Sequence, residues 1–194
     1  MDLGLKGKKA IVTGGTRGIG RAIANLLGEE GCDIGICART AAQIEEAVAA
    51  FKAMGVKAFG SAVDVADGAQ FTSFVKSTAE ALGGLDIFIS NVSAFGVSND
   101  EASWMKGFEI DVLGTLRGCE TAVPFLEKSG AGAIVVVGST AAVEVVGPRS
   151  ANGSVKVAIL PYIKSLARNL APKKVRANVS RPVPSISRAG CGTW

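Results

Sequence analysis

The feature that most constrains the fold is a glycine-rich stretch near the N-terminus, residues 9–23, which reads KAIVTGGTRGIGRAI. Its β-branched start at residues 11–13 predicts a buried strand, and the apolar spacing from Ile19 onward predicts a helix. The glycines between them permit positive φ angles in a tight turn. They also let backbone N–H groups approach a phosphate at the positive end of the helix. The stretch therefore predicts a strand, a phosphate-binding turn and a helix; a turn without a ligand is the alternative.

The composition fits one α/β domain. Of the 194 residues 48% are apolar, only 6% are aromatic, and 25 are glycine, which suits a sheet protein with many tight turns. No run reaches the ~18 consecutive apolar residues of a membrane-spanning helix, so we expect no membrane segment. The first predicted strand begins so early that a signal peptide has no room, and we expect a cytoplasmic location.

Cysteine and histidine usage excludes several kinds of site. The four cysteines form no CxxC pair and the chain has no histidine. We therefore expect neither a disulfide framework nor a metal site. The absence of histidine also excludes the usual Ser-His and Cys-His hydrolase mechanisms.

Charge is unevenly distributed along the chain. The net charge is +4, but nine basic and no acidic residues follow Glu144. Such asymmetry can mark a nucleic-acid surface. Here the basic residues are scattered and have almost no aromatic residues among them, so we do not expect nucleic acid as a partner.

Strand and helix signals alternate along the whole chain. The predicted strands after the first are residues 33–39, 57–65, 85–90, 133–137 and 175–179, and the predicted later helices are 41–54, 69–82, 104–126 and 151–170. We expect Pro124 to kink the end of the long helix, and the very hydrophobic residues 133–137 to lie at the centre of the sheet. This alternation predicts a parallel, doubly wound α/β sheet with its ligand at the carboxyl ends of the strands.

The glycine turn, Thr-Gly-x-x-x-Gly-x-Gly from Thr13 to Gly20, resembles the cofactor turn of the short-chain dehydrogenase/reductase family. The resemblance covers residues 6–179 and implies a three-layer αβα Rossmann fold. It also implies NAD(P)-dependent hydride transfer between nicotinamide and a small carbonyl or alcohol substrate. The cofactor-binding residues that it implies within the turn are Gly14, Thr16, Arg17, Gly18, Ile19 and Gly20.

Two arginines favour NADP(H) over NAD(H). Arg39 ends the second predicted strand, where the adenosine ribose would lie, and no carboxylate is present there. A cation at this place, together with Arg17 in the glycine turn, would pair with the 2′-phosphate of NADP. An ordinary solvated arginine is the alternative reading of Arg39.

Two further matches extend the cofactor site. Asp64 and Val65 match the family's Asp-Val pair, which contacts adenine. Where the family has Asn-Asn-Ala-Gly, this chain has Ser-Asn-Val-Ser, so only Asn91 is kept. The resemblance implies that Asn91 braces the cofactor edge of the sheet; a plain turn residue is the alternative.

The family's catalytic residues are a serine, a Tyr-x-x-x-Lys pair on one helix and an asparagine on the preceding long helix. Ser139 and Lys156 match, which implies that Ser139 polarises the substrate oxygen and that Lys156 holds the nicotinamide ribose. The tyrosine position, one helical turn before Lys156, is Asn152. An amide does not titrate, so the general acid/base is missing. The asparagine position is Asp111, a carboxylate that could pair with Lys156 or accept a proton.

The only tyrosine, Tyr162, has no lysine four residues later, and we expect it to pack on the sheet. Residues 180–194 depart from the family, whose members continue into a Pro-Gly loop and a pocket segment. Codons that encode Ser-Arg-Pro-Val at residues 180–183 can encode Ser-Pro-Gly when read two bases in. Our hypothesis is that a Rossmann domain, residues 1–179, is followed by a frameshifted tail; a genuine short variant is the alternative.

The sequence therefore predicts an NADP(H)-dependent oxidoreductase that is impaired by Asn152 and by the short C-terminus. The alternative is an inactive remnant that binds only nucleotide or a partner subunit. In the family the two long helices often pair between subunits, so we expect a homodimer or homotetramer.

Overall fold

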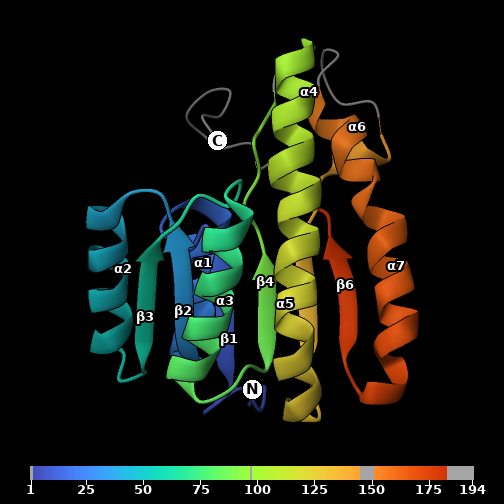
Figure 1. The fold of residues 1–194 in the computed structure, drawn as a ribbon. Coiled ribbons are helices and arrows are strands. Elements are labelled where there is room, and N and C mark those ends of the chain that lie inside the picture. Colours follow the sequence, from blue (N-terminus) through green and yellow to red (C-terminus); the bar gives the residue numbers. More distant parts are fainter. Residues whose placement is uncertain (1, 97, 145–150, 183–194) are drawn as a thin grey trace.

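The protein forms one parallel six-stranded sheet with the strand order β3-β2-β1-β4-β5-β6 (Figure 1). The computed structural model describes residues 2–96, 98–144 and 151–182. The strands are β1 (Lys9–Thr13), β2 (Asp33–Ala38), β3 (Ala58–Ala62), β4 (Ile87–Ser90), β5 (Ala133–Val137) and β6 (Arg176–Ser180). All strands point the same way, so their carboxyl ends share one edge of the sheet, as the alternation of strands and helices predicts.

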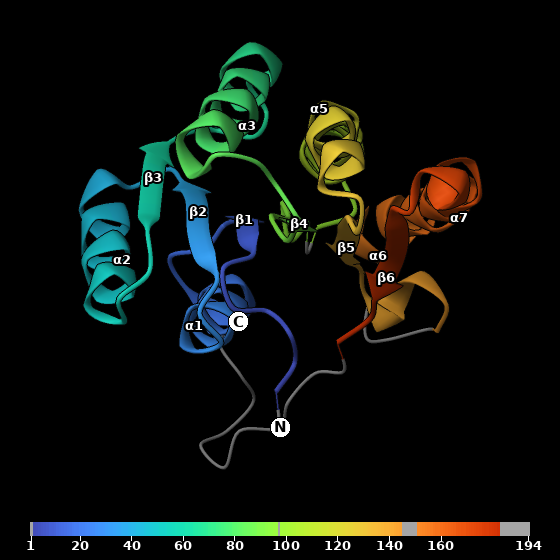
Figure 2. The same ribbon diagram turned by 90° about the horizontal axis from the view of Figure 1, so that it is seen from below.

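Helices cover the sheet in two layers (Figure 2). On one face lie α1 (Gly18–Glu29) and α2 (Ala41–Ala53); on the other lie α3 (Gly68–Leu82), α5 (Gly114–Ser129) and α7 (Ile159–Leu170). Each layer encloses its own apolar core. Phe71, Phe88 and Ile159 lie on the α3 side, and Ile34, Ile36 and Phe51 on the α1 side. The predicted doubly wound α/β fold of Rossmann type is confirmed.

The centre of the sheet differs from the prediction. β1 and β4 are the middle strands, and β5 lies one place from β6, the last strand of the described sheet. β5 is hydrophobic because it is covered on both faces, with Ile134 and Val136 in one core and Val137 in the other. Burial on both faces does not require a central place in the sheet.

The long helix is interrupted where the sequence predicted a regular one. It begins as α4 (Glu101–Gly107), widens into a π-helical segment, η1 (Phe108–Leu113), and continues as α5. Pro124 does not end the helix, because α5 continues through it to Ser129, and the kink expected there stays a prediction. The irregular part of the long helix is the π-helical segment η1. Within it, the Asp111 carboxylate accepts a hydrogen bond from the Ala94 backbone N–H.

The helix predicted for residues 151–170 is two helices, α6 (Ala151–Val157) and α7, separated at Ala158. Pro161 accounts for the break, since proline has no N–H to donate to the preceding turn and is tolerated only in the first turn of a helix. Two short 3-10 segments, η2 (Thr140–Ala142) and η3 (Ala171–Lys173), precede α6 and follow α7. The predicted tail lies outside the described residues from residue 183 onward, so it stays a prediction.

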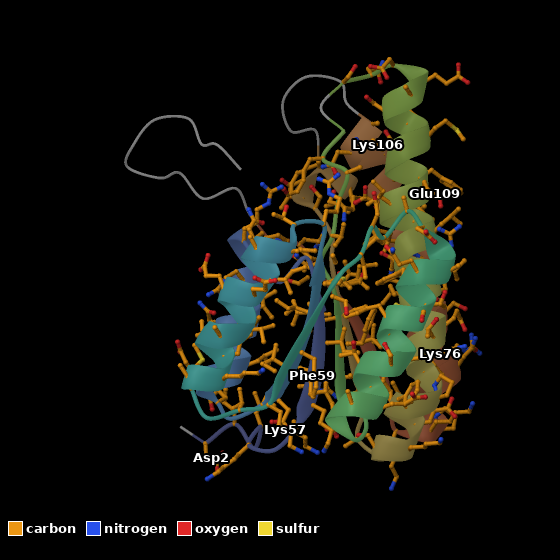
Figure 3. The ribbon with its side chains drawn as sticks, turned by 60° about the vertical axis from the view of Figure 1, so that its left-hand side comes forward. Asp2, Lys57, Phe59, Lys76, Lys106 and Glu109 are labelled. Atoms are coloured by element: carbon orange, nitrogen blue, oxygen red, sulfur yellow. The ribbon has the colours of Figure 1, made fainter. Side chains whose placement is uncertain are left out.

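Side chains from both helical layers fill the space on either side of the sheet (Figure 3). Lys106 and Glu109 mark the part of the long helix near the carboxyl ends of the strands, while Lys57 and Phe59 mark the opposite end. Among the described helices, none is both long and apolar enough to cross a membrane. The same residues include no cluster of three or more His, Cys, Asp or Glu side chains that could hold a metal ion.

Candidate functional site

The glycine turn joins the end of β1 to the start of α1 at the carboxyl edge of the sheet. Gly14 has φ +67°, a conformation that favours glycine, and its N–H donates to the Cys37 carbonyl at 2.8 Å. A Cβ on Gly20 would lie 2.3 Å from the Gly14 carbonyl oxygen, so α1 can approach the turn this closely only with glycine there. Each of these positions therefore requires the glycine that the sequence provides.

The N-terminus of α1 is free to receive an anion. The residue that caps it, Arg17, has extended backbone, and no side chain in the described chain accepts a hydrogen bond from the first turn. The first N–H groups of a helix have no partner within the helix and carry its positive dipole end. A Cβ on Gly18 would meet open space, so the approach to these N–H groups is clear. This cradle fits a pyrophosphate.

Asn91 ties the ends of the two central strands together. Its side-chain Nδ2 donates to the Thr13 carbonyl at 2.9 Å, and its backbone N–H donates to Thr13 Oγ1 at 2.8 Å. Asn91 follows β4 directly and Thr13 ends β1. The side chain thus holds the glycine turn against the neighbouring strand, and its predicted part in cofactor binding stays a prediction.

The adenosine end of the predicted site is more open. Arg17 and Arg39 are both exposed, and neither guanidinium makes a hydrogen bond or an ion pair with any residue that the structure describes. Thr16 Oγ1 lies 3.4 Å from Gln43 Oε1. Asp64 is exposed and accepts the Ala66 N–H at 3.0 Å, whereas Val65 is buried. Two unpaired cations therefore lie next to the free helix terminus and the end of β2.

Ser139 follows β5 and begins the short segment η2. Its Oγ accepts the Ala141 N–H at 3.2 Å, which fixes the side-chain rotamer and leaves the hydroxyl hydrogen to be donated elsewhere. Ser139 is half-buried. A hydroxyl placed in this way can donate to an oxygen atom of a bound molecule.

Lys156 and Asp111 form a buried ion pair. Lys156 Nζ lies 2.8 Å from Asp111 Oδ1 and donates to the Val137 carbonyl at 3.0 Å. The two residues are only 3% and 2% exposed. Asp111 Oδ2 accepts the Ala94 N–H at 3.0 Å, while Oδ1 makes no well-directed hydrogen bond within the described chain. The Lys156 ammonium thus compensates the charge of the Asp111 carboxylate. Of the two roles considered for Asp111, pairing with Lys156 and accepting a proton, the structure contains the ion pair.

Asn152 lies on α6, one turn before Lys156, and is half-buried. Its backbone N–H donates to the Gly96 carbonyl at 3.3 Å. The loop after β4 is therefore attached to the long helix through Ala94 and Asp111, and to the start of α6 through Gly96 and Asn152 and through Ser98, whose carbonyl accepts the Ala151 N–H at 3.2 Å. Phe95 lies between the attachments of Ala94 and Gly96 with φ +48°, an uncommon conformation for a bulky residue, and is 59% exposed. The sequence predicted the two anchoring positions but not this loop, because backbone contacts leave no residue signature.

Tyr162 takes no part in this arrangement. Its hydroxyl donates to Glu120 Oε1 on α5 at 3.0 Å, and its ring packs against the core. Burial, the neighbouring Cys119 and the Glu120 carboxylate raise the pKa of Tyr162 above its usual value. Cys37, next to the glycine turn, is also inert, since burial raises the pKa of its thiol to about 12.

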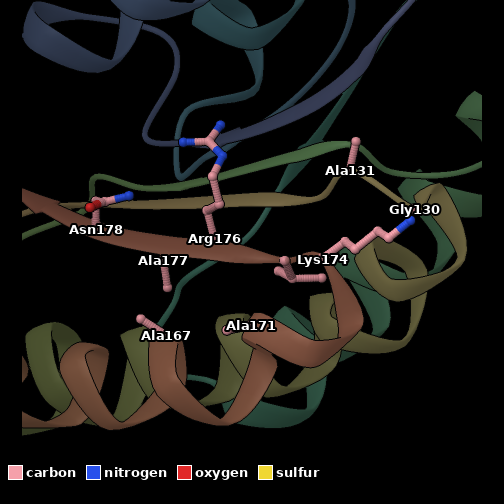
Figure 4. Close-up of a pocket in the computed structure, with 9 residues that line it drawn as sticks. Gly130, Ala131, Ala167, Ala171, Lys174, Arg176, Ala177 and Asn178 are labelled. Carbon is pink, nitrogen blue, oxygen red and sulfur yellow. The ribbon is translucent and has the colours of Figure 1, made fainter.

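A groove of about 780 Å³ lies along β6 (Figure 4). It is lined by Gly130 and Ala131, which precede β5, by Ala167 and Ala171 from the α7 side, and by residues around β6 that include Lys174, Arg176, Ala177 and Asn178. Lys174 and Ala131 are at the amino ends of their strands. The groove therefore extends to the edge of the sheet opposite the glycine turn and does not coincide with the predicted site.

Comparison with known proteins agrees with this geometry. A protein-family profile described as short chain dehydrogenase matches residues 8–186. The isoepoxydon dehydrogenase of Penicillium expansum is 35% identical over 194 residues, covering 98% of this chain and 75% of that enzyme.

Solved structures show the same likeness. A short-chain dehydrogenase from Burkholderia cenocepacia in complex with NADP has a TM-score of 0.85 and 33% identity, covering 92% of this chain and 74% of that one. The carveol dehydrogenase of Mycobacterium avium in complex with NAD has a TM-score of 0.85 and 25% identity, covering 91% and 70%. The structural relatives thus include proteins that bind either nicotinamide cofactor.

Proposed function

This chain belongs to the short-chain dehydrogenase/reductase family, and from that premise we propose that it binds NADP(H) at its glycine turn and is impaired in catalysis. The observation that carries the proposal is the cradle at the start of α1. Gly20 allows the helix to meet the turn, and the first helical N–H groups are free for a pyrophosphate. The proposed substrate class is a small carbonyl compound or alcohol.

The preference for NADP(H) rests on charge. Arg17 and Arg39 are exposed cations beside the glycine turn and the end of β2, and no carboxylate ends that strand. A 2′-phosphate would pair with these guanidinium groups, whereas an unphosphorylated ribose would gain nothing from them. Because one structural relative holds NADP and another NAD, the relatives alone do not decide between the cofactors.

The bound nicotinamide would supply the hydride. Within the protein, the turn and the α1 terminus would hold the pyrophosphate, Asp64 and Val65 the adenine, and Lys156 the nicotinamide ribose. Ser139 would donate a hydrogen bond to the substrate oxygen. A proton must also reach or leave that oxygen, and Asn152 has none to exchange.

The missing acid/base sets the expected rate. Loss of a positioned general acid or base costs on the order of 10²–10⁴-fold, so turnover should be slow even when cofactor is bound. The second candidate function is therefore a nucleotide-binding remnant without catalysis. The observation that favours it is Asn152, whose backbone N–H is already bonded to Gly96 and whose amide does not titrate.

The proposal also covers the oligomeric state and the cellular compartment of the protein. Trp104, Phe108 and Leu116 recur at helical spacing along the long helix and are 36–47% exposed, which supports a homodimer or homotetramer built on that helix. Cys32, Cys37 and Cys119 are free and buried, in keeping with a reducing compartment such as the cytoplasm.

Two measurements test the proposed function together. Fluorescence titration should show saturable NADPH binding by the wild-type protein and by Asn152→Tyr. NADPH oxidation with a panel of small ketones should be slow or absent for the wild type and faster by about 10²-fold or more for Asn152→Tyr. Binding without turnover in both proteins favours the remnant, and absence of NADPH binding in both refutes the cofactor site.

A further inference from the structure

The Asp111–Lys156 pair is the one buried pair of opposite charges beside the proposed nicotinamide ribose site among the described residues. Together the two side chains carry no net charge. The hydrogen bond from the Ala94 N–H does not require a carboxylate, since the amide oxygen of an asparagine could accept it equally well. What the aspartate adds over asparagine is therefore the negative charge itself.

Neighbouring charged groups in the described chain do not offset the charge of either Asp111 or Lys156. Glu109, in the same helical segment, pairs with Arg117 at 2.5 Å and is compensated there. The Lys156 ammonium has its remaining bond to an uncharged group, the Val137 carbonyl. Because both Asp111 and Lys156 are almost fully removed from water, solvent screens their field poorly. Removing either charge leaves the other without its partner and changes the net charge at the site by up to one unit.

The two redox forms of the cofactor differ in the charge of the nicotinamide ring. The oxidised nicotinamide ring carries a formal positive charge and the reduced ring carries none, while the ribose, pyrophosphate and adenosine parts are the same. A lone lysine ammonium beside the ring repels the oxidised form, whereas a lysine paired with a carboxylate does so much less. The net charge at this place therefore acts on the ratio of the two affinities.

We propose that Asp111 determines specificity for the redox form of the cofactor: by cancelling the charge of Lys156, it lets oxidised NADP bind nearly as well as the reduced form. The inference rests on the proposed function, because it needs Lys156 to lie beside the bound nicotinamide ribose. It goes beyond that function because it assigns the preference between oxidised and reduced cofactor to Asp111, which lies outside the glycine turn. The glycine turn would contact the pyrophosphate, which is the same in both forms.

Calorimetric titration of four proteins with NADP⁺ and with NADPH tests the proposal. They are the wild type, Asp111→Asn, Lys156→Met and the double variant. Asp111→Asn should raise the ratio of the NADP⁺ Kd to the NADPH Kd about tenfold, which corresponds to about 1.4 kcal/mol. Lys156→Met should lower the ratio, and the double variant, which is again neutral, should return it close to the wild-type value.

The ratio of the two Kd values separates the effect of charge from the loss of contacts that both redox forms share. Lys156→Met removes a ribose contact from both redox forms, so that loss cancels. If neither single variant moves the ratio, or if the double variant fails to restore it, the proposal is overturned. If Asp111→Asn does not fold, the shift in Lys156→Met and its reversal in the double variant still decide the matter. Failure of the wild type to bind either form overturns the proposed function itself, a result that is distinct from an unchanged ratio.

Discussion

Arg39 is an exposed cation directly after β2, and the proposed preference for NADP over NAD depends on it more than on any other residue of the proposed site. Arg39→Ala should weaken NADPH binding by about tenfold or more and leave NADH binding nearly unchanged, because only NADPH carries the 2′-phosphate. Calorimetry with both cofactors measures this. Arg168→Ala removes the same charge from the exposed face of α7 and serves as the control. Equal losses for both cofactors would contradict the assignment of Arg39.

At this scale the sequence predicted positions better than contacts. The family resemblance placed Lys156 one turn after Asn152 and pointed to Asp111 as a carboxylate that could pair with Lys156, and the structure contains that ion pair. The attachment of Ala94 and Gly96 to the same two positions was missed. Backbone N–H and carbonyl groups are common to every residue, so such contacts depend on the path of the chain rather than on residue type.

Asp86 connects three elements at the amino end of the sheet. Its carboxylate accepts the Lys9 N–H at the start of β1 at 2.9 Å and the Ser129 hydroxyl at the end of α5 at 2.8 Å, and it lies 3.4 Å from Lys8 Nζ. Burial works to raise the pKa of Asp86, but these hydrogen bonds and the Lys8 charge outweigh it and hold the pKa below its usual value. The ionised carboxylate is therefore the form that the fold stabilises.

Asp86→Asn should lower the free energy of unfolding at neutral pH by about 1–3 kcal/mol. The folded-state pKa lies below the unfolded value of about 4, so the stabilisation is present above that pH and is lost as the pH falls below it. The difference between wild type and variant should accordingly shrink in acid. Urea denaturation at pH ~7 and pH ~3 measures it. Asp33→Asn, which removes the charge from a carboxylate that accepts only a single exposed N–H, is the control and should cost less. A difference that stays constant with pH would contradict this account.

Helix and strand types were predictable, but their interruptions were not. Apolar periodicity averages over several turns, so it cannot detect the π segment η1 or the break at Ala158. The π segment contains Asp111, which accepts the Ala94 N–H, and the break lies just before Pro161, which stands inside a pattern that otherwise favoured one helix. In both places the helix departs from the regular geometry that the apolar periodicity predicts.

The whole molecule exposes an apolar stripe on its long helix. If the chain associates through it, Phe108→Glu together with Leu116→Glu should convert the oligomer to monomer, because burying two carboxylates without partners is strongly unfavourable. Sedimentation or light scattering measures the mass. Leu26→Glu on α1, at a residue that is 62% exposed, is the control and should leave the mass unchanged. A wild-type protein that is monomeric would refute the proposed oligomer.

At the scale of the molecule, the alternation of strands and helices predicted the layers and the edge that carries the site, because crossover connections between parallel strands have one hand. It did not predict the place of each strand. The hydrophobic run in β5 indicated burial on both faces, which β1, β4 and β5 share, and so pointed to the wrong centre.

Equilibrium titration with NADPH of the wild type and of Gly20→Ala tests whether the glycine turn binds the cofactor. The methyl group of the variant would lie 2.3 Å from the Gly14 carbonyl oxygen and would push α1 away from the turn. Gly28→Ala on the same helix is the matched control, because its methyl group would meet the flexible Met54 side chain at 3.0 Å and the Phe51 ring at an ordinary 3.9 Å. We expect saturable binding by the wild type and by Gly28→Ala, and binding weaker by about tenfold or more in Gly20→Ala. Wild-type protein that does not bind NADPH, or a Gly20→Ala variant that binds it equally well, would contradict the assignment of the glycine turn as the cofactor site.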